Sequence, residues 1–553
     1  MSTTSTTSPP GSAGWAVVGD QSFSLWRDTQ AFFTSQIEAH GRIFLTRLLN
    51  AKTIVVCSAN AGRQCLLGGA GAGDTQDTED NDGCKEDDRD AADDTKSQQA
   101  HTSSSHAQQG SASSSLDHQH NATDNATDPH QHHKLKHKHG KHGKHGKHHK
   151  HQIHRKHHKH RQQQGRAHHQ HHQHHQQQHE QQPTAAKLER QPAGCPAVLD
   201  RASAYRPFVE KVYGSQCMLL TPKSSAHPEI AALHRVFARP ETCAENLALL
   251  EAWARQQVQQ LSEAEAPFDL YQELKALCVA ATLTLFLGLE DGERDLLHRA
   301  TQLITTHWHG LTSLPIRLNL GFGKGSGLDQ ALDAKEELET IIKGRILRCK
   351  PVPHQQFLFH IVQACQSQGL DVTCRHLLLF ISALIPKALA SLLTSMVVEL
   401  FTSHPDTLER ARSDDQFLER FLTETERLHP PFLAARRTLP KDAVCNIGPY
   451  RVEGERVIMC IFSEMNKDPD VYKNPEAFDA DRWLDASLPK PMTFGWGPDR
   501  CMGQPLARHL LLMFARQLLH HINRVDFEEP PSLSPKWLPV ARPRSQINAC
   551  FRK

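Results

Sequence analysis

The sequence predicts a mainly α-helical fold with a small β domain, and three observations lead to this fold class. Apolar residues recur at helical spacing through most of the chain after residue 194. Two short segments near the N-terminus, rich in β-branched residues, have the pattern of a hairpin. The residues outside one low-complexity insertion are numerous enough for one large enzyme domain.

The N-terminal part of the chain is predicted to hold one helix and one hairpin. Residues 1–14 form a short leader rich in Ser and Thr, which we expect to be disordered. Residues 27–39 have a helical apolar pattern, whereas residues 42–49 and 53–56 alternate or are β-branched around a short turn. We therefore assign residues 15–69 to the first part of the predicted domain.

Residues 70–193 form a predicted disordered insertion. The segment is acidic at first, then rich in Ser, and ends in His/Lys/Gln repeats, so that it holds 25 of the chain's 39 histidines. It has too few apolar residues to bury a core. Clustered imidazoles can bind zinc, copper or nickel, but a solvated low-complexity expansion without a selected role is the favoured interpretation.

The remainder of the domain, residues 194–553, is predicted to be mostly helical. One long apolar stretch, residues 377–400, contains Pro386, Lys387 and Glu399, so we expect a buried core helix there and no evident membrane span. Further helices are predicted at residues 229–237, 243–261, 270–288, 291–306 and 328–346.

Charge and cysteine content limit the classes of partner and compartment. The formal net charge is only +2 because acidic and basic blocks nearly cancel, and we expect no nucleic-acid partner. Fourteen cysteines are scattered without metal-knuckle spacing in a chain with no recognisable signal peptide. We therefore expect reduced cysteines in a cytoplasmic or peripherally membrane-associated protein that is not secreted. A plastid location is the alternative, although the leader is short and lacks arginine.

The most informative motif is a glycine-rich loop around one cysteine. Residues 494–503 are Phe-Gly-Trp-Gly-Pro-Asp-Arg-Cys-Met-Gly, and an apolar helical run follows from Pro505. Glycine and proline permit a tight turn whose backbone can approach a flat ligand closely. The turn delivers Cys501 just ahead of that helix, where the helix dipole and unpaired amide donors favour a thiolate.

These residues resemble the haem-binding loop of the cytochrome P450 superfamily, which implies a P450-like fold around a buried haem. The resemblance implies that Cys501 ligates the haem iron through its thiolate. The implied cofactor is haem b (iron protoporphyrin), with electrons supplied indirectly by NAD(P)H through a reductase or a ferredoxin. The residues implied to contact the haem are Phe494, Gly497, Arg500, Cys501, Gly503 and Arg437.

One position of the loop departs from the family pattern. The family commonly has a basic residue two positions before the cysteine, where it pairs with a haem propionate, and this chain has Asp499. A carboxylate there repels a propionate, and Arg500 is the nearest replacement. The family often places another propionate-binding arginine after the predicted helix that ends at a proline pair. Either Arg436 or Arg437 qualifies, and the sequence does not choose between them.

Two further motifs resemble segments of the same superfamily. Glu424 and Arg427 stand three residues apart at the end of a predicted helix, on one face and within ion-pair reach. Residues 474–483 resemble the family's P-x-x-F-x-x-x-R segment, whose arginine is Arg482 in this chain. The resemblance implies that these three side chains form a buried structural triad that supports the haem loop, because buried charges require mutual pairing.

The predicted central helix lacks the acid–threonine pair that the family normally places beside the iron to deliver protons for dioxygen cleavage. Counting back from His404 and Pro405 puts Ala388 and Leu389 at these two positions, so the catalytic residues are unknown from the sequence. Three interpretations stay open. They are a monooxygenase that takes protons from substrate hydroxyls or ordered water, a hydroperoxide-using enzyme (peroxygenase, isomerase or dehydratase), and a catalytically impaired haem protein.

The expected substrate is an apolar, lipid-like small molecule. Low aromatic content and many helices rich in Leu and Ala indicate a large apolar pocket. A loop at residues 314–325 resembles loops of superfamily branches that act on sterols, terpenoids or retinoids. Oxidation of a sterol, terpenoid or apocarotenoid is therefore the predicted function, with sterol metabolism as one such role. Lys387 either pairs with a substrate carboxylate or points to solvent, and solvent is the favoured interpretation.

Overall fold

The computed structural model describes residues 8–16, 18–67, 198–221, 228–311, 327–537 and 540–553. Residues Met1–Gln76 and Leu188–Lys553 belong to one compact unit, so the chain on both sides of the predicted insertion builds the same unit. The predicted insertion at 70–193 and the predicted loop at 314–325 lie outside the described residues, and both stay predictions.

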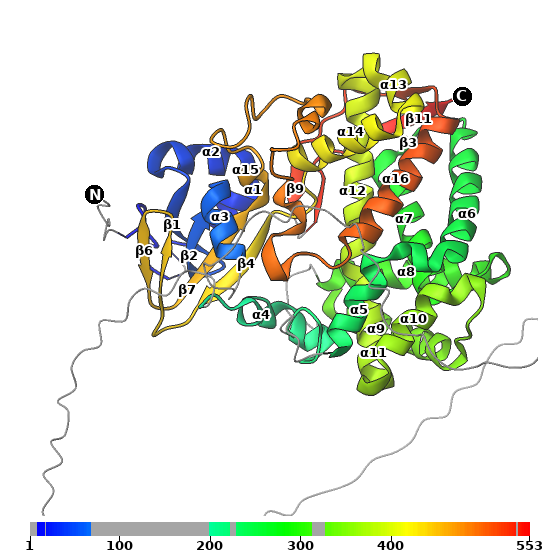
Figure 1. Ribbon diagram of the computed structural model, residues 1–553, viewed down its shortest axis with the longest axis horizontal. Helices are drawn as coiled ribbons and strands as arrows, with labels where there is room; N and C mark the ends of the chain where they lie inside the picture. Colours follow the sequence, from blue (N-terminus) through cyan, green and yellow to red (C-terminus); the bar gives the residue numbers. More distant parts are fainter. Residues whose placement is uncertain (1–7, 17, 68–197, 222–227, 312–326, 538–539) are drawn as a thin grey trace, which may run out of the picture. The chain divides into compact units, whose positions relative to one another are not determined.

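A four-stranded sheet joins segments from the two ends of the sequence (Figure 1). β1 (Ile43–Leu48) and β2 (Ala51–Val56) form the predicted hairpin, and both residues of the turn between them have the positive φ that a tight hairpin turn requires. β2 pairs in parallel with β7 (Arg456–Ile461), which pairs antiparallel with β4 (Ala434–Leu439). The sheet thus contains both β4, with Arg436 and Arg437, and the N-terminal hairpin, with β7 between them.

The other described strands form small sheets of two or three strands. They are β5 (Val444–Ile447) with β6 (Tyr450–Glu453), β9 (Pro535–Trp537) with β10 (Ala541–Pro543), and β11 (Asn548–Arg552) between β3 (Phe268–Asp269) and β8 (Arg524–Phe527).

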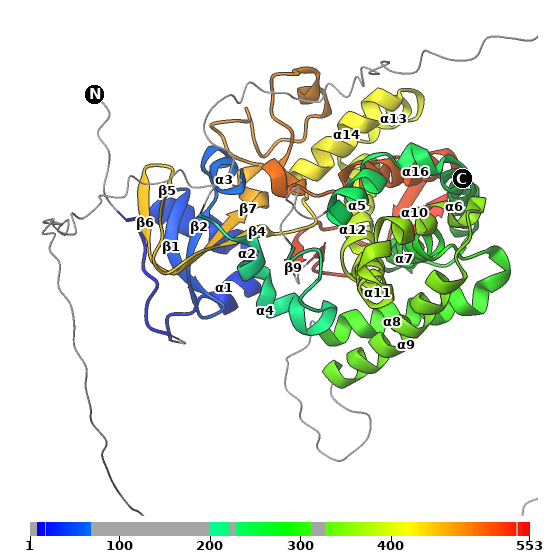
Figure 2. The same cartoon turned by 60° about the horizontal axis from the view of Figure 1, so that its bottom comes forward.

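Helices make up most of the described fold (Figures 1 and 2). Those packed near the sheet are α1 (Ser22–Arg27), α2 (Thr29–His40), α3 (Ala59–Leu66) and the short α15 (Phe462–Met465). The helical part contains α4 (Arg201–Tyr213), α5 (Pro228–Ala238), α6 (Ala244–Ser262), α7 (Leu270–Leu287), α8 (Arg294–Leu311), α9 (Gly327–Arg348), α10 (Gln356–Ala364), α11 (Leu370–Leu379), α12 (Ile385–Val398), α13 (Leu408–Ser413), α14 (Asp415–Leu428) and α16 (Gln504–His521).

Two predicted helix boundaries are wrong, in each case because of a capping group. The predicted helix over 27–39 is interrupted at Asp28, whose backbone is extended and whose carboxylate accepts an N–H of the first turn of α2 at 3.0 Å. The predicted helix over 291–306 starts later, because Glu290 and Glu293 form a capping box around a short 3₁₀ turn that precedes α8.

The helix α12 runs through the middle of the helical part, in contact with α7, α14 and α16 (Figures 1 and 2). One π-helical turn, Phe380–Leu384, connects α11 to α12, and a second, Glu399–Ser403, ends it. Single π turns inside long helices are frequently found at functional sites. The stretch predicted as a buried core helix is therefore helical throughout, with a local irregularity just before Pro386.

Two helical stretches among the described residues are long and apolar enough to cross a membrane. They are Leu270–Leu287, which is α7, and Leu370–Ser403, which contains α11 and α12. Of their apolar windows, 61% and 88% respectively are buried inside the protein. Burial in a protein core accounts for the apolar character of both stretches without a membrane.

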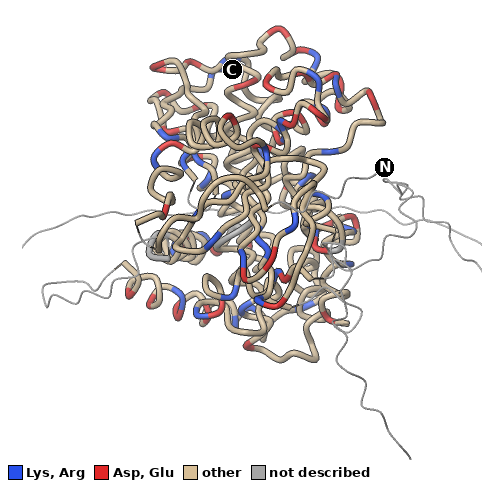
Figure 3. The backbone as a smooth tube through the Cα atoms, turned by 90° about the vertical axis from the view of Figure 1, so that its left-hand side faces the viewer, with Lys and Arg blue, Asp and Glu red and all other residues tan. Residues whose placement is uncertain are grey.

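In the view of Figure 3, basic (blue) and acidic (red) positions are interspersed along the described backbone. Many of the charged side chains are paired across helices, as in the ion pairs of Arg516 with Asp415 and Arg410 with Asp481. This mixed distribution agrees with the net charge of +2.

Candidate functional site

The loop that carries Cys501 includes two short 3₁₀ segments. It leads directly into the N-terminus of α16. The Cys501 backbone N–H donates to the carbonyl of Phe494 at 2.7 Å, which closes the loop. Gly503 is the N-cap residue of α16, two positions after the cysteine. Cys501 itself is exposed, whereas Met492 and Met502, in and beside the loop, are buried. The fold therefore leaves the Cys501 side chain accessible just before a helix N-terminus.

Two glycines of this loop have conformations that other residues adopt only with strain. Gly495 and Gly497 have φ of 80° and 70°, in the left-handed region. At Gly497 a Cβ atom would also lie only 2.8 Å from the Cα of Leu67 and 3.0 Å from the carbonyl oxygen of Leu66, at the end of α3. The glycine pattern in the sequence thus reflects backbone geometry and close packing against α3.

Asp499 lies between two arginines from distant parts of the chain. One carboxylate oxygen is 3.2 Å from Nη2 of Arg437 on β4, and the other is 3.4 Å from Nη1 of Arg201 at the start of α4. Burial lowers the pKa of Arg201, and the neighbouring carboxylate opposes that shift. Two guanidinium groups around one carboxylate leave an excess of positive charge beside the cysteine loop.

Of the two arginines that the sequence left open, Arg437 is the one in this cluster. Its side chain is 6% exposed and also donates to the Arg436 carbonyl. The Arg436 guanidinium lies instead over the ring of Phe208, 5.1 Å from its centroid. Arg500, which the sequence suggested as the replacement for the missing basic residue, is exposed. Arg201 and Arg437 thus both lie within ion-pair distance of Asp499.

These residues fit the haem that the sequence resemblance implies. A thiolate ligand gains from a helix N-terminus, and Cys501 is exposed at such a position. A Cβ atom at Gly503 would lie 3.8 Å from the sulfur of Cys501 and 3.8 Å from the Phe237 ring, so the glycine leaves the side of the sulfur uncovered. The excess positive charge of Arg201 and Arg437 suits a propionate carboxylate.

The arrangement around Asp499 predicts that this carboxylate competes with a propionate for the same two guanidinium groups. Asp499→Asn is expected to tighten haem binding about tenfold, because both arginines become available to the propionate. The haem-free protein is expected to lose about 1–3 kcal/mol of unfolding free energy, because two largely buried cations lose their anion. Haem titration followed at the Soret band and calorimetry of the haem-free protein measure the two effects.

The matched control for this prediction is Asp485→Asn, since Asp485 is an exposed aspartate that is hydrogen-bonded to Ser487. This variant is expected to leave both quantities unchanged. Equal haem affinity of the Asp499→Asn variant and the unaltered protein would contradict the competition.

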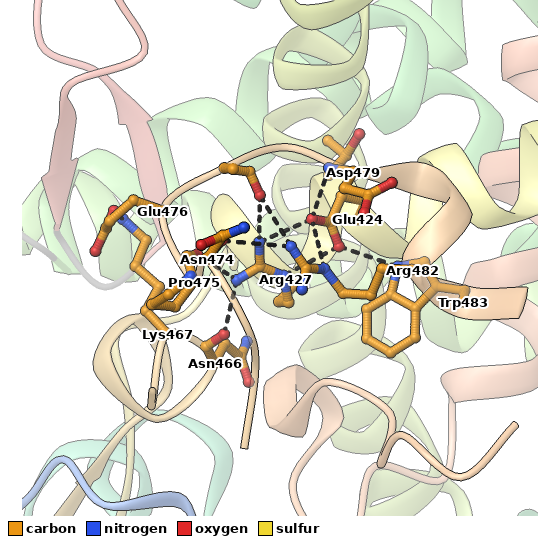
Figure 4. A network of polar contacts seen from close by, with 12 residues as sticks. Glu424, Arg427, Asn466, Lys467, Asn474, Pro475, Glu476, Asp479, Arg482 and Trp483 are labelled. Carbon is orange, nitrogen blue, oxygen red and sulfur yellow. Dashed lines mark hydrogen bonds and ion pairs between the residues drawn. The ribbon is translucent and has the colours of Figure 1, made fainter. Parts of the chain in front are cut away.

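The predicted triad residues form a buried network that connects α14 with the segment after β7 (Figure 4). Glu424 accepts from Nη2 and Nε of Arg427 at 2.8 and 3.0 Å, and from Nε of Arg482 at 3.2 Å. Its carboxylate also accepts from the indole N–H of Trp483 at 3.0 Å and from the backbone N–H of Asp479 at 3.0 Å. The Glu424 carboxylate thus accepts hydrogen bonds from two guanidinium groups, an indole and a backbone amide.

Arg427 extends this network to the backbone of the neighbouring loop. Its guanidinium donates to the carbonyls of Asn466, Pro475 and Ala477 at 3.0, 2.6 and 3.0 Å. The side chains of Glu424 and Arg427 are both 0% exposed. Asn466 continues the connection, because its amide accepts from the Met492 N–H at 2.8 Å and donates to Thr493 at 3.1 Å. The triad is thus linked through hydrogen bonds to the residues that begin the cysteine loop.

Removal of the negative charge at the centre of the network is expected to be strongly destabilising. Glu424→Gln leaves Arg427 and Arg482 buried without an anion, a change that typically costs about 3–5 kcal/mol. We expect a matching fall in the free energy of unfolding and poor haem retention, measured by urea denaturation and by haem content. Glu419→Gln on the exposed face of α14 is the control, and its effect is expected to stay within about 0.5 kcal/mol. Equal stability of the two variants would contradict a supporting role.

The central helix carries no acid or hydroxyl at the two positions where the family has its acid–threonine pair. Leu389 is buried and Ala388 is half-buried in the first turns of α12. Neither side chain can hold or move a proton. The departure that the sequence predicted therefore occurs within a well-formed helix and next to the π turn.

The favoured interpretation of Lys387 as a solvent-directed lysine is wrong. Its side chain is buried, with only 6% of the residue exposed. The ammonium group donates to the Ser382 carbonyl at 2.7 Å and lies 3.9 Å from the centroid of the Trp308 ring on α8. Its stem and head both lie within the protein because the π turn and α8 provide a carbonyl acceptor and an aromatic face.

Sequence reasoning missed several residues of these clusters. Arg201 has no motif around it, and its pairing with Asp499 depends on the approach of α4 to β4, which the backbone bonds between Asp200 and Thr438 show. Trp483 directly follows Arg482 in the recognised segment, so its indole was the one missed group with a local signal. The tertiary neighbours of Lys387 had no such signal.

The family model described as cytochrome P450 matches residues 402–551, which contain the buried triad and the Cys501 loop. A protein named cytochrome P450-terp from a Pseudomonas species is 31% identical over 144 residues, which are 25% of this chain and 32% of that protein. Putative cytochrome P450 120 from a Synechocystis species is 27% identical over 305 residues, which are 50% of this chain and 66% of that protein. The matched regions thus span from about a third to just under two thirds of these relatives.

A solved structure of the cyanobacterial CYP120A1 with retinoic acid bound has a similar fold. It aligns with 99% of this chain and 100% of its own length, with a TM-score of 0.64 and 17% sequence identity. At this identity the likeness concerns the fold, which is mainly helical with small sheets in this chain as the sequence predicted.

Proposed function

We propose that this chain, whose residues 402–551 match the cytochrome P450 family model, is a haem-thiolate oxidoreductase of that superfamily that inserts oxygen into an apolar, lipid-like small molecule. The observation that carries the proposal is the exposed Cys501, held at the N-terminus of α16 by a loop that requires glycine at two positions. A buried structural cysteine would not need such a presentation.

Each residue of the site has a definite task under this proposal. Haem b, when bound, supplies the redox and oxygen chemistry that amino-acid side chains lack. Cys501 would hold it through sulfur, and Arg201 and Arg437 would balance the charge of a propionate. The buried network around Glu424 keeps the preceding loop in place through Arg427 and Asn466. Electrons are proposed to come from NAD(P)H through a separate reductase or ferredoxin.

The proposed substrate class is a sterol, terpenoid or apocarotenoid. Retinoic acid in the related cyanobacterial structure is a molecule of this apolar, isoprenoid kind, and it supports the choice. The buried apolar residues of α12, such as Leu389, Leu392 and Leu393, provide apolar surface in the centre of the helical part. Such surface favours burial of a lipid-like ligand.

A second candidate function follows from Ala388 and Leu389. An enzyme that uses a hydroperoxide receives oxygen that is already reduced, and it therefore needs no acid–threonine pair for proton delivery. A peroxygenase, or an isomerase or dehydratase of lipid hydroperoxides, fits these apolar positions. The impaired haem protein is the limiting case, in which neither route gives turnover.

The proposal is tested with purified, haem-loaded protein and a small panel of retinoic acid, a sterol and a monoterpene alcohol. Binding is measured as a substrate-induced shift of the Soret band, and product is measured with a surrogate reductase and NADPH. We expect a shift and an oxygenated product for at least one class. Haem-free protein after reconstitution, or haem-loaded protein that gives no product with reductase or with hydroperoxide, would contradict the proposed activity.

A further inference from the structure

The start of α12 contains a proline whose missing N–H leaves a specific carbonyl without an α-helical donor four residues later. Pro386 has no backbone donor, so the carbonyl of Ser382, four residues earlier, has no α-helical N–H to accept. Ser382 lies in the π-helical turn Phe380–Leu384 that joins α11 to α12. The residue is fully buried, where an unsatisfied carbonyl is unfavourable.

The side chain of the next residue provides the missing donor. Nζ of Lys387 donates to the Ser382 carbonyl at 2.7 Å. The same ammonium group lies 3.9 Å from the centroid of the Trp308 ring, so it is held between the π turn and α8. Burial lowers the pKa of Lys387 well below its usual value, with the nearby Lys275 as a second cause. The Lys387 side chain can donate this hydrogen bond in either protonation state, because a neutral amine also has N–H groups.

Ser382 connects the same turn to a third helix. Its hydroxyl is bonded to the Leu378 carbonyl one turn earlier and lies 3.3 Å from the Tyr213 hydroxyl at the end of α4. Burial raises the pKa of Tyr213 to about 12, which keeps the phenol protonated and able to donate. The carbonyl and hydroxyl of one residue thus tie the π turn to α8 through Lys387 and to α4 through Tyr213.

We propose that Lys387 is a positioning residue that replaces the backbone donor lost at Pro386 and so fixes the π turn of the central helix against α4 and α8. Ala388 and Leu389 follow immediately in the chain, so this turn sets the place of the apolar positions where the superfamily has its acid and threonine. The link to substrate binding rests on the proposed function, whereas the hydrogen-bond replacement does not.

A double-mutant cycle between residues 386 and 387 tests the replacement. Lys387→Met keeps an apolar stem of similar length and removes the donor, whereas Pro386→Ala restores a backbone N–H. We expect Lys387→Met to lower the unfolding midpoint of the full chain by several degrees. In the Pro386→Ala background the same substitution is expected to lower it by less than half as much, because the restored amide can satisfy Ser382.

The control pair is Lys335→Met with and without Pro386→Ala. Lys335 is a lysine of α9 that pairs with Glu339 on the same helix, and its effect is expected to be independent of residue 386. Equal effects of Lys387→Met in both backgrounds would overturn the proposal. If Lys387→Met alone does not fold, recovery of folded protein by the added Pro386→Ala supports the proposal, and failure of that rescue overturns it.

A second readout separates this inference from the proposed activity. In haem-loaded protein, Lys387→Met is expected to raise the substrate dissociation constant, measured by the Soret shift, about tenfold, and Pro386→Ala is expected to restore most of it. Stability coupling without any Soret shift in the unaltered protein would leave the positioning of the turn intact and reject the proposed function. The positioning role alone would be rejected if all variants had the same substrate dissociation constant and if Lys387→Met lowered the unfolding midpoint equally with and without Pro386→Ala.

Discussion

Cys501→Ala is expected to abolish the far-red-shifted Soret band that the ferrous carbon monoxide complex of the unaltered protein shows. This band requires a thiolate ligand to iron, and Cys501 is the exposed cysteine of the loop that precedes α16. Loss of the ligand also removes the main anchor of the haem, so we expect oxidation of any substrate to fall to background. The measurement is a difference spectrum of reduced protein with and without carbon monoxide.

The matched control for this variant is Cys349→Ala. Cys349 is a partly exposed cysteine near the end of α9, and burial raises its pKa, so it has the features of an inert structural thiol. The control is expected to keep both the band and the haem content. A spectrum of the unaltered protein that is typical of histidine ligation, or retention of the far-red-shifted band in Cys501→Ala, would contradict the assignment of the ligand.

The parts of the site that could be predicted from the sequence are those determined by short-range spacing. Glycines 495 and 497 are needed by a turn that is local in the chain, and Glu424 and Arg427 face each other because they are three residues apart on one helix. The partner Arg482 came from a recognised segment, and the structure brings it to Glu424 at 3.2 Å. Local geometry and recurring motifs were sufficient for these residues.

The parts that could not be predicted depend on contacts between distant elements. The isolated sequence indicates repulsion between Asp499 and a propionate, but it does not reveal that Arg201 and Arg437 lie on either side of that carboxylate. Lysine is usually solvated, so the burial of Lys387 depends on the Trp308 ring, which belongs to another helix. The π turn Phe380–Leu384, which ends two residues before Pro386, is a local irregularity that the apolar pattern of residues 377–400 does not reveal.

The second large effect concerns the source of oxygen. Ala388 and Leu389 occupy the positions of the acid and the threonine, and neither can deliver a proton. Loss of a positioned acid–base group typically lowers a rate by on the order of 10²–10⁴-fold. The reductase-driven reaction of the unaltered protein is therefore expected to be slow and uncoupled, with most reducing equivalents released as peroxide. An added hydroperoxide is expected to give faster product formation, because it bypasses the proton-dependent step.

The test compares product formed per NADPH consumed with product formed from cumene hydroperoxide, for the unaltered protein and for Ala388→Glu combined with Leu389→Thr. The double variant is expected to raise the coupling of the reductase-driven reaction at least tenfold and to change the hydroperoxide reaction much less. Ala390→Thr is the control, because it adds the same hydroxyl to the same buried helix one position later, on a different face. An equal gain from the control would contradict the assignment of residues 388 and 389 as the positions where the missing pair matters.

Tight coupling in the unaltered protein would contradict this prediction and would require another proton path. Among the described residues, a cavity of about 290 Å³ is lined by Ser391 and Ser395 of α12 and by Glu464, together with other residues. Burial raises the pKa of Glu464 above its ordinary value. Under tight coupling, Glu464→Gln is expected to lower the coupled rate, whereas under the predicted uncoupled regime it is expected to change neither reaction. The Glu464→Gln variant therefore distinguishes a protein that delivers protons by another path from a protein that has lost proton delivery.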